Sequence, residues 1–283
     1  MKIIKTINQD YELIDLKDGY KYERIGGVLI KRPDSNAKGT LNNPNIEQQL
    51  DAEYIGEVGK GNFITHRDLP DNWMVNMNDM HLRIKPSSYK HIGLFPEQKV
   101  HWDYVKDKIE ASDKPVKVLN LFAYTGAATI NAALAGASEV VHVEALKQLN
   151  NWAQENSKLS NADHLNIRYF QDDVISFLKR EIKRGNKYQI IIMDPPSFGR
   201  GPKQQIWKFQ DNIDELLSLS AQLLEDPLCL IISTYTPSVN KDALYHTLKK
   251  HFNQTDIETY AMVLEAVNNK RLYCGVGGTI NFK

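Results

Sequence analysis

The chain has 283 residues, 42% of them hydrophobic, and its 35 basic and 35 acidic side chains cancel. This composition excludes a disordered chain. A net charge of zero gives no global electrostatic attraction for nucleic acid, although it does not exclude a local basic patch. No apolar run reaches the roughly 20 residues of a membrane helix, no signal peptide is evident, and the two cysteines and eight histidines lack metal spacing. We expect a cytoplasmic protein with neither membrane segment nor metal.

The first ninety residues indicate a small, mostly β domain. Residues 11–16 alternate in polarity, and Asp18-Gly19 after them is a good hairpin signal. Further strands are expected at residues 21–23, 28–30, 73–77 and 81–84, with a loop over 31–45. We predict one domain over residues 1–90 and a second over residues 91–283.

From residue 116 onward, strand and helix patterns alternate. The expected strands cover residues 116–122, 139–144, 166–170, 188–194, 228–233, 256–264 and 272–282. The expected helices cover residues 127–135, 145–159, 174–184, 207–224 and 240–252. Such alternation implies parallel βαβ units. The sequence therefore predicts an α/β fold with a doubly wound, mostly parallel, seven-stranded sheet and helices on both faces.

The segment Y-Q-I-I-I-M-D-P-P-S-F at residues 188–198 is the most informative one. A buried strand stops at Asp194, and two prolines follow that fix φ and cannot donate hydrogen bonds. A carboxylate, free carbonyls and the ring of Phe198 are thus expected at a strand's carboxyl end, where open α/β sheets bind ligands. The alternative is a plain loop with a solvated aspartate.

Another strand end leads into the turn F-A-Y-T-G at residues 122–126. A strand, a tight turn and a helix N-terminus form a natural site for a polar ligand group, and Gly126 allows close backbone approach. However, Phe122 and Tyr124 stand where a G-x-G pattern would have glycines. The alternative interpretation is therefore a packed turn that binds no ligand.

Two acidic residues end the next two strands. Glu144 lies eighteen positions after Gly126 and could accept from both hydroxyls of a ribose, although an exposed, solvated glutamate at a helix N-terminus is also favoured by the dipole. Asp173 could accept from an adenine amino group, and it could equally cap a helix.

Together the four strand ends describe a crevice for a nucleoside-type cofactor. A phosphate-bearing cofactor would need a glycine-rich cradle or basic residues, which the Thr125-Gly126 turn lacks. Carboxylates favour a ligand with hydroxyls, an amine and a positive centre. S-adenosylmethionine fits this description better than NAD or ATP.

From about Gly93 to the end, the chain resembles the Rossmann-like S-adenosylmethionine-dependent methyltransferases, and in particular the bacterial 23S rRNA large-subunit base methyltransferases. The resemblance rests on G-L-F-P-E-Q at 93–98, V-L-N-L-F-A-Y-T-G at 118–126, D-D-V at 172–174 and D-P-P-S-F-G-R-G at 194–201. In that subgroup the F-x-Y-T-G form replaces the usual glycine run.

The resemblance implies a role for each matching residue. The turn 122–126 would hold the methionine part, Glu144 the ribose and Asp173 the adenine. The implied cofactor-binding residues are Phe95, Gln98, Asn120, Phe122, Ala123, Tyr124, Thr125, Gly126, Glu144, Ala145, Asp173, Val174 and Asp194. Phe95 and Gln98 would close over the cofactor. The implied catalytic residues are Asp194, Pro195 and Phe198, facing the methyl group and the target.

One departure bears on the chemistry. Relatives that methylate carbon use a cysteine after the fifth strand, whereas residues 233–236 read S-T-Y-T. We expect Cys229 and Cys274 to be structural. The prediction is therefore a methyltransferase that acts on a base of ribosomal RNA without a cysteine nucleophile.

Other assignments stay open. The N-terminal segment does not match the RNA-binding module of many relatives and could be a lid or a dimerisation element. A homodimer is therefore one possibility. Arg200, Lys203 and Lys208 could meet a substrate phosphate or simply form a solvated face, and Phe198 could stack on a base or fill the core. A methyltransferase of small molecules or proteins, or a non-catalytic RNA-binding protein, is an alternative. The missing G-x-G-x-x-G disfavours an NAD-dependent dehydrogenase.

Overall fold

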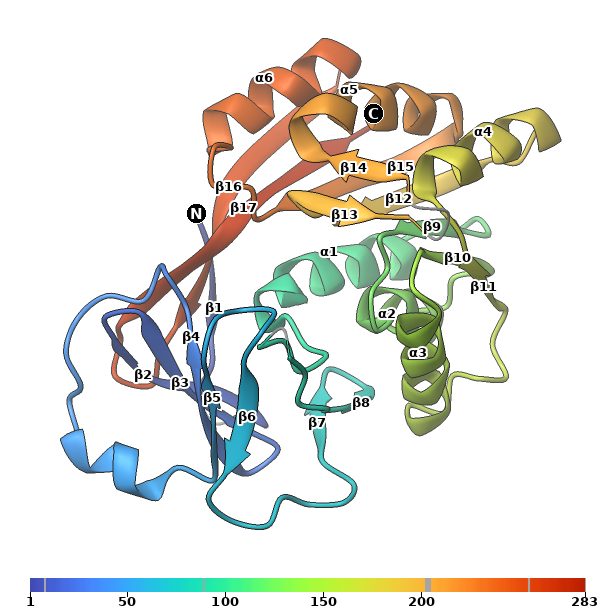
Figure 1. Cartoon of the computed structure of the whole chain (residues 1–283). Helices are drawn as coiled ribbons and strands as arrows, with labels where there is room; N and C mark the ends of the chain where they lie inside the picture. The colour runs from blue at the N-terminus through green and yellow to red at the C-terminus, as the bar shows by residue number, and fades with distance from the viewer. Residues whose placement is uncertain (8, 89, 202–204, 254, 283) are drawn as a thin grey trace. The chain divides into compact units, whose positions relative to one another are not determined.

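The computed structural model describes residues 1–7, 9–88, 90–201, 205–253 and 255–282. The chain forms two compact units: Met1–Val100 with Met262–Cys274, and His101–Ala261 with Gly275–Lys283 (Figure 1). The division into domains 1–90 and 91–283 stays a prediction. No helix among the described residues is both long and apolar enough to cross a membrane, and these residues contain no metal-binding group of three or more His, Cys, Asp or Glu side chains.

The first unit is rich in β structure, as expected. Its five-stranded sheet has the order β2 (Tyr11–Lys17), β3 (Tyr20–Ile25), β4 (Val28–Pro33), β5 (Ala52–Ile55), β6 (Asn62–Thr65). A second hairpin joins β7 (Met74–Met77) to β8 (Met80–Arg83), and two short 3-10 helices are η1 (Pro44–Gln49) and η2 (Pro96–Gln98). The predicted hairpin is confirmed, because β2 and β3 pair antiparallel around Gly19, whose φ is 81°. The sequence patterns did not reveal β5 or β6.

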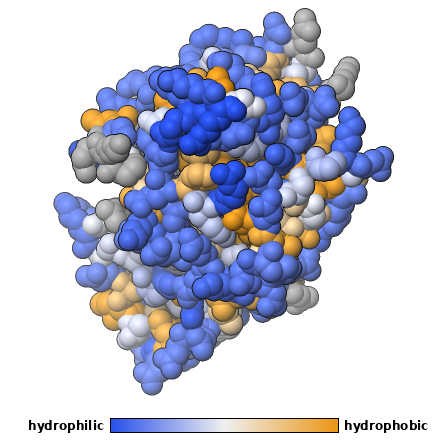
Figure 2. All heavy atoms as spheres, turned by 90° about the vertical axis from the view of Figure 1, so that its right-hand side faces the viewer, coloured by the Kyte–Doolittle hydropathy of each residue, from blue (hydrophilic) through white to orange (hydrophobic). Residues whose placement is uncertain are grey.

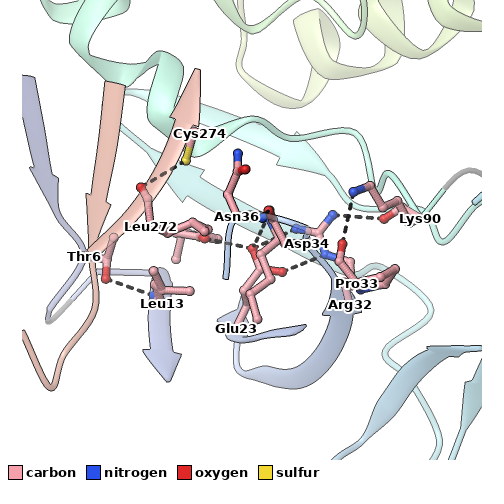
Figure 3. Close-up of polar contacts among 12 residues, drawn as sticks. Thr6, Leu13, Glu23, Arg32, Pro33, Asp34, Asn36, Lys90, Leu272 and Cys274 are labelled. Carbon is pink, nitrogen blue, oxygen red and sulfur yellow. Dashed lines mark hydrogen bonds and ion pairs between the residues drawn. The ribbon is translucent and has the colours of Figure 1, made fainter. Parts of the chain in front are cut away.

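A buried ion pair fastens this unit internally (Figure 3). Arg32 on β4 donates from Nε and Nη2 to the carboxylate of Glu23 on β3, at 2.7 and 2.8 Å. Burial acts to raise the pKa of Glu23, but the charges of Arg32 and Lys21 outweigh it and lower that pKa to about 2. Arg32 also donates from Nη1 to the Lys90 carbonyl at 3.0 Å, which ties the segment that follows β8 to the sheet.

The large sheet confirms the predicted α/β fold. Its order is β1-β16-β17-β15-β12-β9-β10-β11. The strands are β1 (Lys2–Lys5), β9 (Lys117–Leu121), β10 (Glu139–Glu144), β11 (Ile167–Gln171), β12 (Tyr188–Met193), β15 (Leu224–Thr234), β16 (Asp256–Glu265) and β17 (Arg271–Asn281). Neighbours from β15 through β11 are parallel, whereas β17 is antiparallel to β15. The seven expected strands are present, and β1 adds an eighth by pairing with residues 262–265 of β16.

Alternating strand residues supply two separate cores, as a doubly wound sheet requires. The helices are α1 (Lys99–Glu110), α2 (Ala127–Leu134), α3 (Lys147–Leu159), α4 (Val174–Arg184), α5 (Phe209–Gln222) and α6 (Lys241–His251). Leu119 and Leu121 of β9 belong to the cluster with residues of α4, α5 and α6. Val118, one position before Leu119, belongs to the cluster with residues of α1 and α2. The face in Figure 2 is mainly hydrophilic, with hydrophobic residues in small groups.

One short hairpin was not predicted. Strands β13 (Phe198–Arg200) and β14 (Ile206–Lys208) pair antiparallel directly after the Asp-Pro-Pro turn. The expected helix over 207–224 therefore begins at Phe209, because Trp207 belongs to β14, and Leu224 begins β15. Strands of three residues are too short to show a period of two, so no pattern in the sequence separates them from a helix.

Candidate functional site

The strand registers bring the predicted strand ends to one edge of the sheet. Leu121 of β9 pairs with Val143 of β10 on one side and with Met193 of β12 on the other. Parallel strands in this register end level with each other, so the turns after β9, β10 and β12 emerge side by side. Open α/β sheets bind ligands at this carboxyl edge.

The turn after β9 is wound like a glycine-rich loop although it contains only one glycine. Phe122, Tyr124 and Gly126 all have positive φ angles, of 55°, 52° and 86°. A non-glycine residue held there costs on the order of 1–3 kcal/mol, and such residues gather at functional sites. Phe122 and Tyr124 thus adopt the backbone conformation of the glycines they replace.

Packing also explains Gly126. A Cβ added at this position would lie 2.8 Å from the Cβ of Ala153 on α3. The Thr125 carbonyl accepts from Asn156 Nδ2 of the same helix at 2.9 Å, and Ala123 is buried as well. The turn is therefore tightly packed on its inner side, which is compatible with a ligand on its outer side.

Glu144 is linked directly to this turn. Its Oε2 accepts from the Tyr124 amide at 3.1 Å, and its Oε1 accepts from the Leu146 amide at 3.0 Å, across the half-buried Ala145. Burial raises the pKa of Glu144, and these amide hydrogen bonds oppose the rise. The side chain is only 8% exposed, so the alternative of a solvated glutamate is wrong. A carboxylate offers about four lone-pair sites, so acceptor capacity for a ribose contact remains beyond these amide bonds.

Asp173 caps helix α4, as one alternative predicted. Its Oδ1 accepts from the Ser176 amide at 2.9 Å, and Val174 begins the helix. The preceding Asp172 accepts from the Asp173 amide and pairs with Arg180. Within the described part of the chain, Oδ2 of Asp173 accepts no hydrogen bond. The cap therefore leaves one acceptor oxygen for the predicted adenine contact, which stays a prediction.

Asn120 belongs to a buried network beneath the turn. Its Nδ2 donates to Thr129 Oγ1 at 2.9 Å, and Thr129 Oγ1 lies 2.9 Å from His142 Nδ1. Burial lowers the pKa of His142 to about 3, so the ring is neutral at physiological pH. Which of Thr129 and His142 donates in this contact depends on the tautomer of the imidazole ring. The predicted cofactor contact of Asn120 stays a prediction.

The Asp-Pro-Pro turn is fixed from two sides. Ser233 at the end of β15 donates to Asp194 Oδ1 at 2.6 Å, and the Asp194 amide donates to the Leu121 carbonyl at 3.3 Å. Pro195 is buried, and its carbonyl accepts no hydrogen bond from the described residues. The carboxylate is thus held at the sheet edge, next to an available backbone acceptor.

Sequence reasoning missed Trp207. Its indole is 7% exposed, and its Nε1 donates to the Pro196 carbonyl at 2.6 Å. The same ring packs against Phe122, with centroids 4.9 Å apart. Trp207 therefore links the turn after β9 to the turn after β12. The only available signal was the alternation of Ile206, Trp207 and Lys208, which is too short to interpret.

The remaining predicted residues lie in different environments. Phe198 is 54% exposed on β13, Arg200 and Lys208 are exposed on the same hairpin, and Lys203 lies outside the described residues. Phe95 and Gln98 belong to the first unit, where the Gln98 amide donates to the Phe95 carbonyl at 3.0 Å. Their predicted closure over the cofactor stays a prediction.

The two cysteines have thiols with raised pKa values. Cys229 is fully buried within β15, and burial raises the pKa of its thiol to about 12. Burial likewise raises the pKa of Cys274 well above its usual range. Because the thiolate is the reactive form, a raised pKa lowers the fraction of each thiol that can react at neutral pH.

The donor set at this edge fits S-adenosylmethionine. Carboxylates stand at Glu144, Asp173 and Asp194, while residues 119–127 contain no basic side chain that would hold a phosphate. The fold and this set of residues together define a Rossmann-like methyltransferase. The family model for S-adenosylmethionine-dependent methyltransferases matches residues 59–254, and the chain belongs to this family. S-adenosylmethionine is accordingly its cofactor.

Individual relatives agree with this assignment. The crystal structure of a methyltransferase from Agrobacterium tumefaciens, titled as dependent on the same cofactor, is 29% identical with a TM-score of 0.94, covering 100% of this chain and 94% of that one. Ribosomal RNA large subunit methyltransferase K/L of Shewanella frigidimarina is 32% identical over 53% of this chain and 20% of its own length. Ribosomal RNA large subunit methyltransferase K of Neisseria meningitidis is 26% identical over 72% of this chain and 55% of its own length. The chain thus spans from a fifth to about half of these curated relatives.

Proposed function

We propose that this protein transfers a methyl group from S-adenosylmethionine to a base of large-subunit ribosomal RNA in the cytoplasm, without a cysteine nucleophile. The observation that carries the proposal is the Asp194 carboxylate, held by Ser233 beside the Pro195 carbonyl, with an exposed aromatic ring four residues further on. The names of the curated relatives support ribosomal RNA as the substrate.

In this proposal the predicted residues hold the cofactor. The turn 122–126 contacts the methionine part, Glu144 the ribose and Asp173 the adenine, while Phe95 and Gln98 close over it. When bound, S-adenosylmethionine supplies a methyl group already activated on a sulfonium. The protein therefore needs chiefly to align the acceptor atom with that group, and alignment alone can supply several kcal/mol of the barrier.

In this proposal Asp194 and Pro195 contact the methyl acceptor. Both offer hydrogen-bond acceptors, which suit a base amine and would orient its lone pair. Ser233 donates to Asp194 and fixes the carboxylate rotamer. The residue at this end of β15 is a serine, and both cysteines are buried with raised pKa values. Methylation through a covalent cysteine adduct is therefore disfavoured, and an exocyclic or ring nitrogen is the favoured acceptor.

The test is methyl transfer from labelled S-adenosylmethionine to ribosomal RNA that lacks natural methylation, followed by digestion to nucleosides and mass analysis. Asp194→Asn should lower kcat by roughly 10²-fold or more if the carboxylate acts on the acceptor's proton. Asp163→Asn, at an exposed loop carboxylate, should leave the rate unchanged. Glu144→Gln should instead weaken binding of S-adenosylhomocysteine in calorimetry.

Two outcomes would favour the alternatives. Label that survives ribonuclease and appears in protein or small molecules would exclude the RNA substrate. Cofactor binding without transfer to any acceptor would favour a non-catalytic RNA-binding protein. The homodimer is a separate prediction, and sedimentation analysis would decide it.

A further inference from the structure

The hairpin after the Asp-Pro-Pro turn is an antiparallel ribbon with two different faces. Phe198 pairs with Lys208, Gly199 with Trp207, and Arg200 with Ile206. Side chains of opposed residues project to the same side of a two-stranded ribbon, and successive pairs alternate. Phe198, Arg200, Ile206 and Lys208 therefore share one face, which we call the ribbon face.

The exposed fractions agree with this division. Phe198 and Ile206 are 54% and 56% exposed, and Arg200 and Lys208 are also exposed, whereas Trp207 on the opposite face is 7% exposed. Large hydrophobic side chains are thus presented to solvent between two cations. Trp207 secures the ribbon from behind through its bond to the Pro196 carbonyl and its contact with Phe122.

The charge of this segment stands out in a chain whose net charge is zero. Residues 198–208 contain three basic side chains and no acidic one. Lys208 forms an ion pair with Asp211 on α5, at 3.6 Å. Such a combination of cations and an aromatic ring complements a nucleic acid strand, in which phosphates alternate with flat bases.

We propose that the ribbon face binds a single-stranded RNA segment next to the target nucleotide, with Phe198 stacked on a base and Arg200 and Lys208 on phosphates. Stacking requires an unpaired base, which a duplex does not present. The proposal rests on the proposed function, because it names the part of the substrate that the ribbon contacts. It also gives an approximately neutral protein a local source of affinity for RNA.

The test is binding of a fluorescently labelled single-stranded RNA of about ten nucleotides, with the dissociation constant measured across a series of salt concentrations. Removing both cations in R200A/K208A should reduce the slope of log affinity against log salt by about 1.4, at about 0.7 for each phosphate contact. Phe198→Ala should weaken binding roughly 5- to 150-fold, the range of one base stack, with an unchanged slope.

Lys183→Ala is the matched control. Lys183 is an exposed residue in the last turn of α4, and a helix that follows a parallel strand returns to the opposite edge of the sheet. This variant should keep both the slope and the affinity. Calorimetry with S-adenosylhomocysteine on every variant should give the wild-type affinity, which verifies that the fold is intact.

An unchanged salt slope in R200A/K208A would overturn the proposal, as would tighter binding to duplex RNA of the same sequence. These failures are separable from failure of the proposed function. If R200A/K208A methylates ribosomal RNA with unchanged KM, only the ribbon proposal fails. If the wild type binds RNA through the ribbon but methylates a different class of acceptor, only the proposed function fails.

Discussion

The ring of Phe122 lies against the indole of Trp207, with centroids 4.9 Å apart and planes inclined by 59°. Phe122 belongs to the turn proposed to hold the cofactor, and Trp207 supports the turn proposed to face the methyl acceptor. Trp207 also donates to the Pro196 carbonyl. One aromatic contact therefore couples the two halves of the proposed site, and a displacement of one turn would displace the other.

Trp207→Phe should impair methyl transfer more than its effect on stability would explain. The variant keeps a ring against Phe122 but loses the hydrogen bond to Pro196, which should cost about 1 kcal/mol of unfolding free energy. Misplacement of the acceptor turn should lower kcat by about 10- to 100-fold. The measurements are urea unfolding and single-turnover methyl transfer.

Trp73→Phe provides the matched control. Trp73 is also buried, and its indole donates to the Ile25 carbonyl at 2.7 Å within the first unit. Its replacement should lower stability by a similar amount and leave kcat unchanged. Equal loss of kcat in the two variants would contradict a specific role for Trp207.

Ser233→Ala should lower kcat without a large change in KM for S-adenosylmethionine. The substitution removes the 2.6 Å hydrogen bond to Asp194, and a hydrogen bond to a charged group contributes about 1.5–3 kcal/mol. A tenfold or greater fall in rate is expected, with recovery in Ser233→Thr. Ser138→Ala removes a similar bond, to the Val116 carbonyl at 2.9 Å, and should not alter the rate. A rate loss shared by both alanine variants would indicate a general packing effect.

Gly126→Ala should destabilise the protein more than Gly136→Ala. Both glycines have positive φ, 86° and 98°, which an alanine tolerates poorly. Only Gly126 has a neighbour in the way, because its added Cβ would lie 2.8 Å from that of Ala153, whereas nothing lies within 4 Å at Gly136. Adding Ala153→Gly should recover part of the difference, which a double-mutant cycle in urea would show as coupling of about 0.5–3 kcal/mol. Equal costs at the two glycines would contradict the packing explanation.

His142 should make the free energy of unfolding fall as the pH is lowered over a defined range. Burial lowers its pKa from 6.5 to about 3, and its ring is fully buried. Below pH 6.5 the unfolded chain binds a proton that the folded chain does not bind until about pH 3. Each pH unit in this window should therefore lower the unfolding free energy by about 1.4 kcal/mol through this residue. Urea unfolding from pH 6 to pH 4 should show a slope of unfolding free energy against pH that is smaller by about one proton in His142→Gln, and identical slopes would refute this assignment.

Local patterns were sufficient for much of this fold. The strand expected at residues 139–144 and the helix expected at 174–184 have those bounds in the structure. Hydrophobic periodicity together with glycine, proline and acidic caps is encoded within short segments. The predicted residues Gly126, Glu144, Asp173 and Asp194 follow successive strands, so their meeting at one sheet edge follows once parallel order is inferred. The sequence also shows that Phe122 and Tyr124 stand where glycines would be expected. Only the positive φ angles of these two residues explain how the turn still forms.

The sequence by itself determined the fold class and the residues at the strand ends, because these depend on local composition and spacing, while its motifs carried the resemblance to the family. The tertiary structure alone decided how those residues are supported. Ser233 reaches Asp194 across 39 positions of sequence, and Thr6 reaches the Glu265 carbonyl across 259. Similarly, β1 joins the large sheet, residues 262–274 join the first unit, and Trp207 meets Phe122. Contacts between distant segments leave no periodic pattern in either segment, so they appear only when the chain is folded.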